Sequence, residues 1–155
     1  MANIAQTVNV LQAMVLTEGE KMILTPTYHV FEMYKVHQDA EKLDLSIETD
    51  TYRLNDEDLP SVSATASKDV NGKIHLSLCN LNPNEQSKVT VELRGITGVE
   101  AIEGRVLTAD ERNAHNTFNN PENVKPVAFE GYELSGDQLT VTLPNMAVVA
   151  LTIDC

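Results

Sequence analysis

The first forty residues carry a hydrophobic pattern of helical period. Four apolar side chains recur at spacings of four, three and four residues, which places them on one face of an α-helix: Ile4, Val8, Leu11 and Val15. Other apolar residues widen that face, so more than half of this helix is expected to be buried. We predict that the helix ends at Gly19, because glycine readily takes the positive φ of a C-cap.

A second short helix is predicted after an extended stretch at residues 21–25. Thr25 has the side chain of an N-cap, and Pro26 suits the first helical position. Val30, Phe31 and Tyr34 would then face inward. Two helices with broad apolar faces and no sheet of their own need a surface to pack on, so we infer that residues 1–38 pack on a body outside this sequence.

After about residue 40 the hydrophobic period falls to two. Apolar and polar side chains alternate in four runs, at residues 43–47, 74–78, 89–93 and 139–143. Such alternation is typical of strands with one buried and one solvated face. The predicted fold is therefore mainly β: an antiparallel β-sandwich or jelly roll over residues 41–155, preceded by a two-helix segment over residues 1–40.

Turn residues separate the predicted strands. Asn71-Gly72 lies between two such runs and indicates a hairpin with a type I′ turn. Residues 113–126 are rich in Asn and Pro and show no periodicity, which predicts a long surface loop.

The charge balance excludes two classes of partner. The chain has 11 basic and 23 acidic residues and a net charge of −12. Nucleic-acid binding needs clustered Lys and Arg, and an anionic membrane would repel this chain. No run of about 18 apolar residues is present to span a bilayer. We expect neither nucleic acid nor membrane as a partner.

The residues that could carry chemistry do not form a recognisable site. Cys79 is expected to be a buried thiol, and the acidic run at 56–58 lacks the central glycine of a calcium loop and is expected to be a solvated turn. Glu100 and Glu103 would point to opposite faces of a strand. His29 and His37 lack a third ligand, so we interpret them as packing residues and expect no metal or cofactor.

Two strings in the first part of the chain carry a family resemblance. The sequences AQTVNVLQA, from residue 5, and TPTYHVFEMY, from residue 25, resemble the end of the catalytic barrel in α-L-arabinofuranosidases of glycoside hydrolase family 51. The strand-rich remainder is similar to the C-terminal β-sandwich of that family in length and position. The resemblance implies that residues 1–40 are a helical segment from the end of a (β/α)8 barrel and that residues 41–155 are the C-terminal domain.

The same resemblance implies a function for a longer parent enzyme. Family members remove terminal arabinofuranosyl residues from arabinan and arabinoxylan oligosaccharides with retention, using two glutamates that would lie before Met1. A retaining mechanism needs its two carboxyl groups about 5–5.5 Å apart, and this chain does not contain that pair, so alone it is expected to be inactive. The barrel is then its partner, and the family implies a homo-oligomer. The resemblance favours a cytoplasmic location, with a periplasmic or secreted location as the alternatives.

One residue of this chain is implied in substrate binding. Gln6 matches a family glutamine that lines the sugar subsite, where an amide can both donate and accept hydrogen bonds. The other interpretation is that Gln6 is only a polar residue near the start of a helix.

An alternative function is a stand-alone carbohydrate-binding or adhesion module. Sugar binding usually relies on exposed aromatic rings. The chain has no Trp, and outside the first forty residues its Phe and Tyr residues are Tyr52, Phe118, Phe129 and Tyr132. We therefore favour a structural role over this alternative.

Overall fold

The computed structural model describes residue 4 and residues 7–155. Strands dominate these residues, with one α-helix and one 3-10 turn. In chain order the elements are β1 (Val15–Glu18), β2 (Lys21–Leu24), α1 (Pro26–Tyr34), η1 (Lys35–His37), β3 (Glu41–Lys42), β4 (Thr51–Leu54), β5 (Glu57–Pro60), β6 (Val62–Lys68), β7 (Ile74–Asn80), β8 (Ser87–Glu92), β9 (Ala101–Leu107), β10 (Val127–Ala128), β11 (Tyr132–Ser135), β12 (Gln138–Leu143) and β13 (Val148–Asp154).

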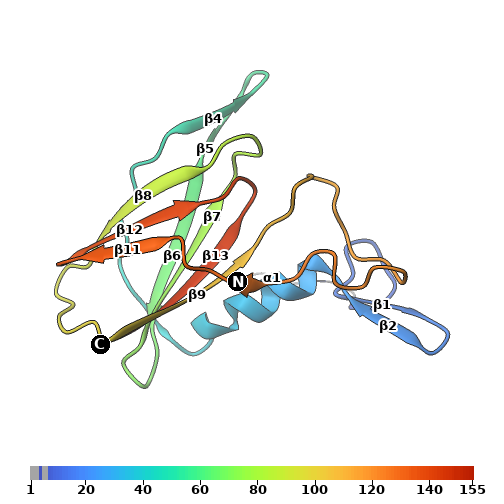
Figure 1. Cartoon of the computed structure of the whole chain (residues 1–155), viewed down its shortest axis with the longest axis horizontal. Helices are drawn as coiled ribbons and strands as arrows, with labels where there is room; N and C mark the ends of the chain where they lie inside the picture. The colour runs from blue at the N-terminus through green and yellow to red at the C-terminus, as the bar shows by residue number, and fades with distance from the viewer. Residues whose placement is uncertain (1–3, 5–6) are drawn as a thin grey trace.

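Two antiparallel sheets enclose the main core. The larger sheet has the strand order β10-β9-β13-β7-β6-β3, and the smaller has the order β11-β12-β8 (Figure 1). Their facing side chains form one cluster, with Leu76 and Leu78 of β7 and Leu151 of β13 from the larger sheet and Leu139 and Val141 of β12 from the smaller. The predictions of a mainly β, antiparallel fold and of strands at residues 74–78, 89–93 and 139–143 are confirmed.

The other face of the larger sheet is covered by helix α1. Met33, Leu107 and Val124 form a second buried cluster there, and Val30 and Tyr34 pack on it, as predicted. Phe31 is half-buried outside that cluster, whereas the fully buried Met33 was not foreseen. The prediction of a solvated face on β7 is wrong, because His75 and Ser77 on that face are buried and both contact His37 of η1.

Helix α1 begins as the sequence predicts. Thr25 has extended φ and ψ angles, and its Oγ1 accepts a hydrogen bond from the Tyr28 amide at 3.4 Å, with Pro26 at the first position. The Thr25 hydroxyl also donates to the Ala13 carbonyl at 2.7 Å, which holds the helix start against the preceding turn.

The predicted first helix does not form, so the two-helix segment is a single helix. Val8 makes a parallel bridge to Val15, and Asn9 and Gln12 have positive φ angles of 53° and 59°, which no right-handed helix contains. The following residues form the β1–β2 hairpin. Gly19 takes its positive φ of 59° in the turn of that hairpin and caps no helix.

The hairpin at Asn71-Gly72 forms, but not with a type I′ turn. That turn needs positive φ at both central residues, and of the pair only Gly72 has it. The Gly72 amide donates to the Asp69 carbonyl at 3.1 Å, and Asp69 Oδ1 accepts from the Asn71 and Lys73 amides at 2.9 Å each. The Asp69 side chain therefore shapes a longer turn that ends on the glycine.

Two other predictions on irregular regions have different outcomes. Residues 113–126 form a long loop without regular strands, as predicted. Residues 43–47 were expected to form a strand, yet only Glu41 and Lys42 pair with β6, and residues 43–50 belong to no strand. Among the residues that the structure describes, no strand pairs with this alternating segment.

Candidate functional site

A buried polar cluster lies between helix and sheet. His37, at the end of η1, is hydrogen-bonded through Nδ1 to Ser67 Oγ at 2.7 Å and through Nε2 to Ser77 Oγ at 2.8 Å. The ring of His75 lies 6.3 Å from that of His37 and is hydrogen-bonded to Thr152 and Asp69. Burial, and then the neighbouring His75, lower the pKa of His37.

This cluster joins elements and offers no reaction centre. A serine nucleophile must reach substrate, but Ser67 and Ser77 are both buried. Each hydroxyl is occupied by a ring nitrogen of His37. The cluster therefore fastens η1 to strands β6 and β7, as the packing interpretation of His37 predicted.

His29 of α1 is half-buried, and its ring lies 5.5 Å from that of Tyr28. Burial lowers its pKa, the negative charge of Glu32 partly opposes this shift, and the positive charge of Arg105 adds to it. Arg105 of β9 pairs with Glu32 at 2.8 Å and ties helix to sheet. In the part of the chain that the structure describes, no three potential metal ligands come together.

The other candidate side chains stand apart. Asp56, Glu57 and Asp58 lie at the exposed tip of the β4–β5 hairpin, where a hydrogen bond from Arg53 lowers the pKa of Asp58. Glu100 and Glu103 are exposed. Cys79 is half-buried beside the helix, and burial raises the pKa of its thiol.

The aromatic residues do not form a sugar-binding platform. Phe129 is 6% exposed in the main core, and Tyr132 packs against it while its hydroxyl donates to the Ile102 carbonyl. Tyr52 and Phe118 are half-buried, one on the β4–β5 hairpin and one in the 113–126 loop. None of these four rings forms the exposed aromatic platform that the carbohydrate-binding alternative requires.

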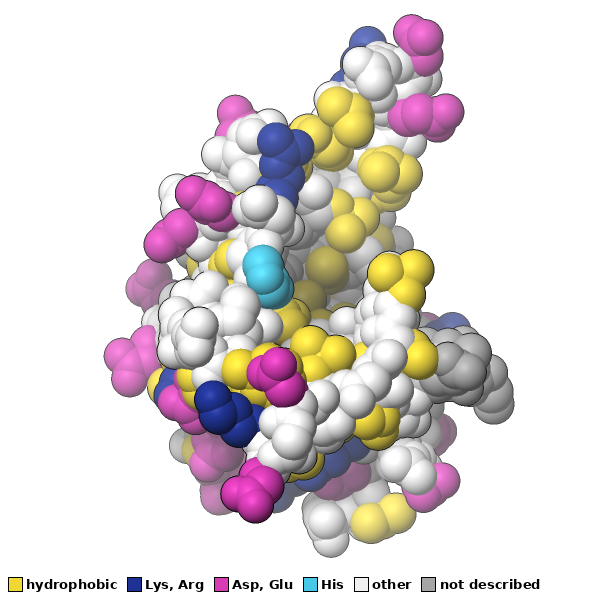
Figure 2. Space-filling view, turned by 90° about the vertical axis from the view of Figure 1, so that its right-hand side faces the viewer, with side chains coloured by type: hydrophobic (Ala, Val, Ile, Leu, Met, Phe, Trp, Pro, Cys, Tyr) yellow, Lys and Arg dark blue, Asp and Glu magenta, His cyan; other side chains and the backbone are white. Residues whose placement is uncertain are grey.

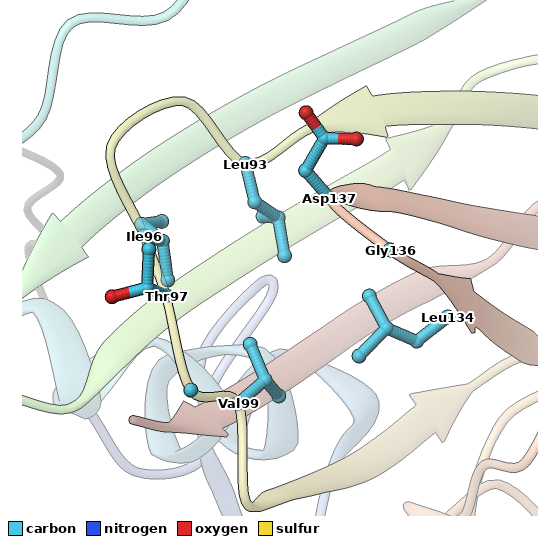
Figure 3. Close-up of a pocket in the computed structure, with 8 residues that line it drawn as sticks. Leu93, Ile96, Thr97, Val99, Leu134, Gly136 and Asp137 are labelled. Carbon is cyan, nitrogen blue, oxygen red and sulfur yellow. The ribbon is translucent and has the colours of Figure 1, made fainter.

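A small pocket at one end of the two sheets is also unsuited to a sugar. It has a volume of about 330 Å³ and lies between the loop that follows β8 and the β11–β12 turn. Figure 3 shows Leu93, Val99 and Leu134 converging on it while the Asp137 carboxylate points away. The residues that line the pocket include no aromatic ring on which a sugar could stack.

An exposed apolar surface lies around the β1–β2 hairpin. Val8, Leu11 and Met22, here called the hairpin surface, are 48%, 94% and 64% exposed. Figure 2 faces the side from which this hairpin projects, and it shows hydrophobic side chains around a hollow in the middle of that face, below the projecting β4–β5 hairpin. Exposed apolar patches mark association sites.

Gln6, the residue that the family resemblance implies in sugar binding, lies outside the described residues.

A larger cleft opens between the two sheets beside β8. Its volume is about 1820 Å³, and it is lined by residues 42–51, by β6 and β8, and by core side chains of β7. No strand of the described residues closes the core here.

None of the described helices has the length and hydropathy of a membrane-spanning segment.

These features define a β-rich domain whose elements are joined by buried polar groups and whose described residues present no assembled reaction centre. The sequence model of the α-L-arabinofuranosidase C-terminal domain matches residues 1–147. The chain belongs to this family.

Solved and curated relatives agree with this assignment. An intracellular exo-α-L-arabinofuranosidase of Bacteroides ovatus is 44% identical over 154 residues, which is 99% of this chain and 30% of the relative. The crystal structure of a family 51 arabinofuranosidase from Xanthomonas axonopodis pv. citri is 45% identical with a TM-score of 0.95, over 99% of this chain and 31% of that one. An arabinofuranosidase from Thermotoga maritima, 24% identical with a TM-score of 0.84 over 97% of this chain and 33% of that one, shares the fold. The chain thus spans about 30% of the length of the curated relative from Bacteroides ovatus.

Proposed function

We propose that this chain is the non-catalytic C-terminal domain of a retaining exo-α-L-arabinofuranosidase that acts on arabinan or arabinoxylan oligosaccharides. The observation that carries the proposal is the family match over residues 1–147, together with 44% identity to an exo-α-L-arabinofuranosidase of which the chain covers 30%. The catalytic carboxylates of such an enzyme belong to the part of the polypeptide that this chain does not cover.

The role of the domain is to cover and support the catalytic barrel. In this proposal residues 1–40 form the junction with the barrel, and residues 41–155 form a β-sandwich of jelly-roll type. The hairpin surface supports the junction, because Leu11 and Met22 are exposed in this chain and an apolar side chain gains stability when a partner covers it. The two sheets that share one core support the sandwich.

Gln6 is proposed to line the sugar subsite at this junction. It lies two residues before Val8, which bridges Val15 of β1 and belongs to the hairpin surface. Its amide would hydrogen-bond sugar hydroxyls beside carboxylates supplied by the barrel. In addition, we propose that the whole enzyme is a homo-oligomer, with this acidic domain at or near the subunit contacts.

The test is a chimera in which this chain replaces the matching C-terminal part of the Bacteroides ovatus relative. An aryl α-L-arabinofuranoside assay should give turnover with the chimera and none with the 155-residue chain alone. Gln6→Ala in the chimera should lower kcat/KM, whereas Asn119→Ala, on an exposed loop position, should leave it unchanged. Turnover by the isolated chain, or an inactive chimera that is folded, would contradict the proposal.

A further inference from the structure

The turn between β6 and β7 contains Asn71-Gly72, the one Asn-Gly pair of the sequence. Asn71 is exposed, and its side-chain amide makes no hydrogen bond to the described residues. The preceding Val70 is 90% exposed, so water reaches this turn. Asparagine is among the chemically labile residues of proteins, and a glycine after it removes the side chain that would otherwise shield the next backbone nitrogen.

The Gly72 nitrogen is accessible from the side of the Asn71 side chain. A Cβ placed on Gly72 would meet only Lys68 Cε, at 3.9 Å. The φ of Gly72 is +88°, in the region that glycine adopts at no steric cost. No neighbouring group therefore blocks the approach of this nitrogen to Asn71 Cγ.

We propose that Asn71 is a modification site, where the side-chain amide is converted to isoaspartate through a cyclic imide formed with the Gly72 nitrogen. The Gly72 nitrogen attacks Asn71 Cγ, a C–N bond forms, and the Cγ–Nδ2 bond breaks, so that ammonia leaves with the proton of the Gly72 amide. Water then opens the ring. Its attack on the backbone carbonyl carbon of residue 71 breaks the bond from that carbon to the Gly72 nitrogen and gives isoaspartate, whereas attack on Cγ gives aspartate.

Asp69 controls how often this reaction can begin. The Gly72 amide donates to the Asp69 carbonyl at 3.1 Å, and Asp69 Oδ1 accepts from the Asn71 and Lys73 amides at 2.9 Å each. The Gly72 N–H must leave its carbonyl and lose its proton before the nitrogen can attack. The reaction therefore needs an opened turn, and the hydrogen bonds of Asp69 oppose that opening.

The product would disturb the contacts on which the turn depends. Isoaspartate lengthens the backbone by one carbon atom directly beside the pair Lys68↔Ile74, with which the β6–β7 register begins. It also places a new carboxylate close to that of Asp69, whose Oδ2 lies 3.3 Å from His75 Nε2. Like charges repel, so we expect the modified turn to be less stable than the original one. The proposal does not depend on the proposed function, because the reaction needs only this turn and water.

Incubation of the folded 155-residue chain near pH 7 and near pH 9 tests the reaction. After proteolysis, the peptide that contains Asn71 should show a mass gain of about 1 Da, and more of it at the higher pH, because the attacking amide must lose its proton. Methylation by an isoaspartate-specific methyltransferase should label the same peptide. The peptide with Asn119, an exposed residue without a following glycine, should keep its mass. An unmodified Asn71 in the folded chain, over the time in which the urea-unfolded chain reacts completely, would overturn the proposal.

Two variants at position 69 test the control by Asp69. Asp69→Ala removes the acceptor of two amides and should raise the rate by about fivefold or more. Asp69→Asn keeps an acceptor oxygen and removes only the charge, so its rate should stay within about twofold of the original. The unfolded original chain should also react about fivefold or more faster than the folded one, a comparison that needs no variant. Equal rates in the folded and unfolded chains would refute the control by Asp69.

Thermal unfolding of the separated product tests the effect on the fold. The isoaspartate fraction should melt several degrees below the unmodified chain. Asn71→Asp is the matched control, because it carries the same added charge without the extra backbone atom, and it should melt close to the original. An isoaspartate fraction that melts together with Asn71→Asp would show that the turn accommodates the extra atom, which would contradict the expected loss of stability.

Discussion

His37 Nε2 and Ser77 Oγ are hydrogen-bonded at 2.8 Å although 40 residues separate them in the sequence. Ser67 holds the other ring nitrogen, so one imidazole links η1 to two strands of the larger sheet. A neutral ring donates through one nitrogen and accepts through the other, which the rotating serine hydroxyls can match. A protonated ring would have to donate through both.

The first prediction concerns the pH dependence of stability. Burial and His75 lower the pKa of His37 in the folded state, so the unfolded chain binds its proton more readily. Stability is then fully present above about pH 6.5 and falls as the pH drops below that value, levelling off under the folded pKa. Urea unfolding between pH 8 and pH 5 measures this loss.

His37→Gln should make that pH dependence shallower, because an amide does not titrate in this range. A residual slope should remain, since burial also lowers the pKa of His29. His115→Gln, at an exposed loop position, is the control and should leave the slope as it is. An unchanged slope in His37→Gln would show that His37 is not responsible.

The second prediction concerns Asn116, a buried amide that organises the long loop. Its Nδ2 donates to the carbonyls of Leu24 and Val124 at 2.8 Å and 3.0 Å, and its Oδ1 accepts from the Val124 amide at 2.7 Å. Asn116→Ala leaves these groups unpaired and should cost about 2–4 kcal/mol in the free energy of unfolding. Asn119→Ala, on the exposed side of the same loop, should cost less than about 0.5 kcal/mol.

The third prediction concerns the close approach at Gly104. A Cβ there would collide with the Phe129 carbonyl oxygen and lie 3.1 Å from Leu151 Cδ2. Gly104→Ala should therefore destabilise the fold by about 2 kcal/mol or more, measured by thermal unfolding. Gly98→Ala is the comparison: it meets open space but has a φ of +77°, so it should cost only about 1 kcal/mol. Equal losses in the two variants would mean that space at Gly104 is not limiting.

The fourth prediction concerns the hairpin surface. Leu11 is 94% exposed, so Leu11→Asp should change the stability of the isolated chain by less than about 0.5 kcal/mol and reduce its self-association in sedimentation experiments. In the chimera the same change should lower the melting temperature, because it places a carboxylate in the proposed barrel junction. Val70→Asp is the matched control, since Val70 is 90% exposed at the opposite β6–β7 turn and should be silent in both proteins.

The sequence predicted those elements whose signals are local. The strands at 74–78, 89–93 and 139–143 follow from period-two alternation, and the start of α1 follows from Thr25 and Pro26. The expected helix at residues 4–15 failed because four apolar residues at helical spacing also fit a turn followed by a hairpin strand, and tertiary pairing decided between them. Residues 43–47 have the pattern of a strand, but among the described residues no strand pairs with them.

The organising contacts were beyond sequence reasoning for a different reason. His37 finds its serines 30 and 40 residues away, and Asn116 finds Leu24 at a separation of 92 residues. No periodicity records such pairings. The sequence does not distinguish a buried Asn in a polar loop from a solvated one. Gln6 stays a candidate that is known only from its sequence motif.

Strand β7 turns its leucines to the main core and its His75 and Ser77 to His37 of η1, and both faces are covered. Such a strand cannot slide against its neighbours by one residue. The slip would carry a histidine and a hydroxyl in among leucines, with nothing to accept or donate, and would press apolar side chains onto the polar contacts of His37. The chemical difference between the two faces thus allows β7 only one alignment.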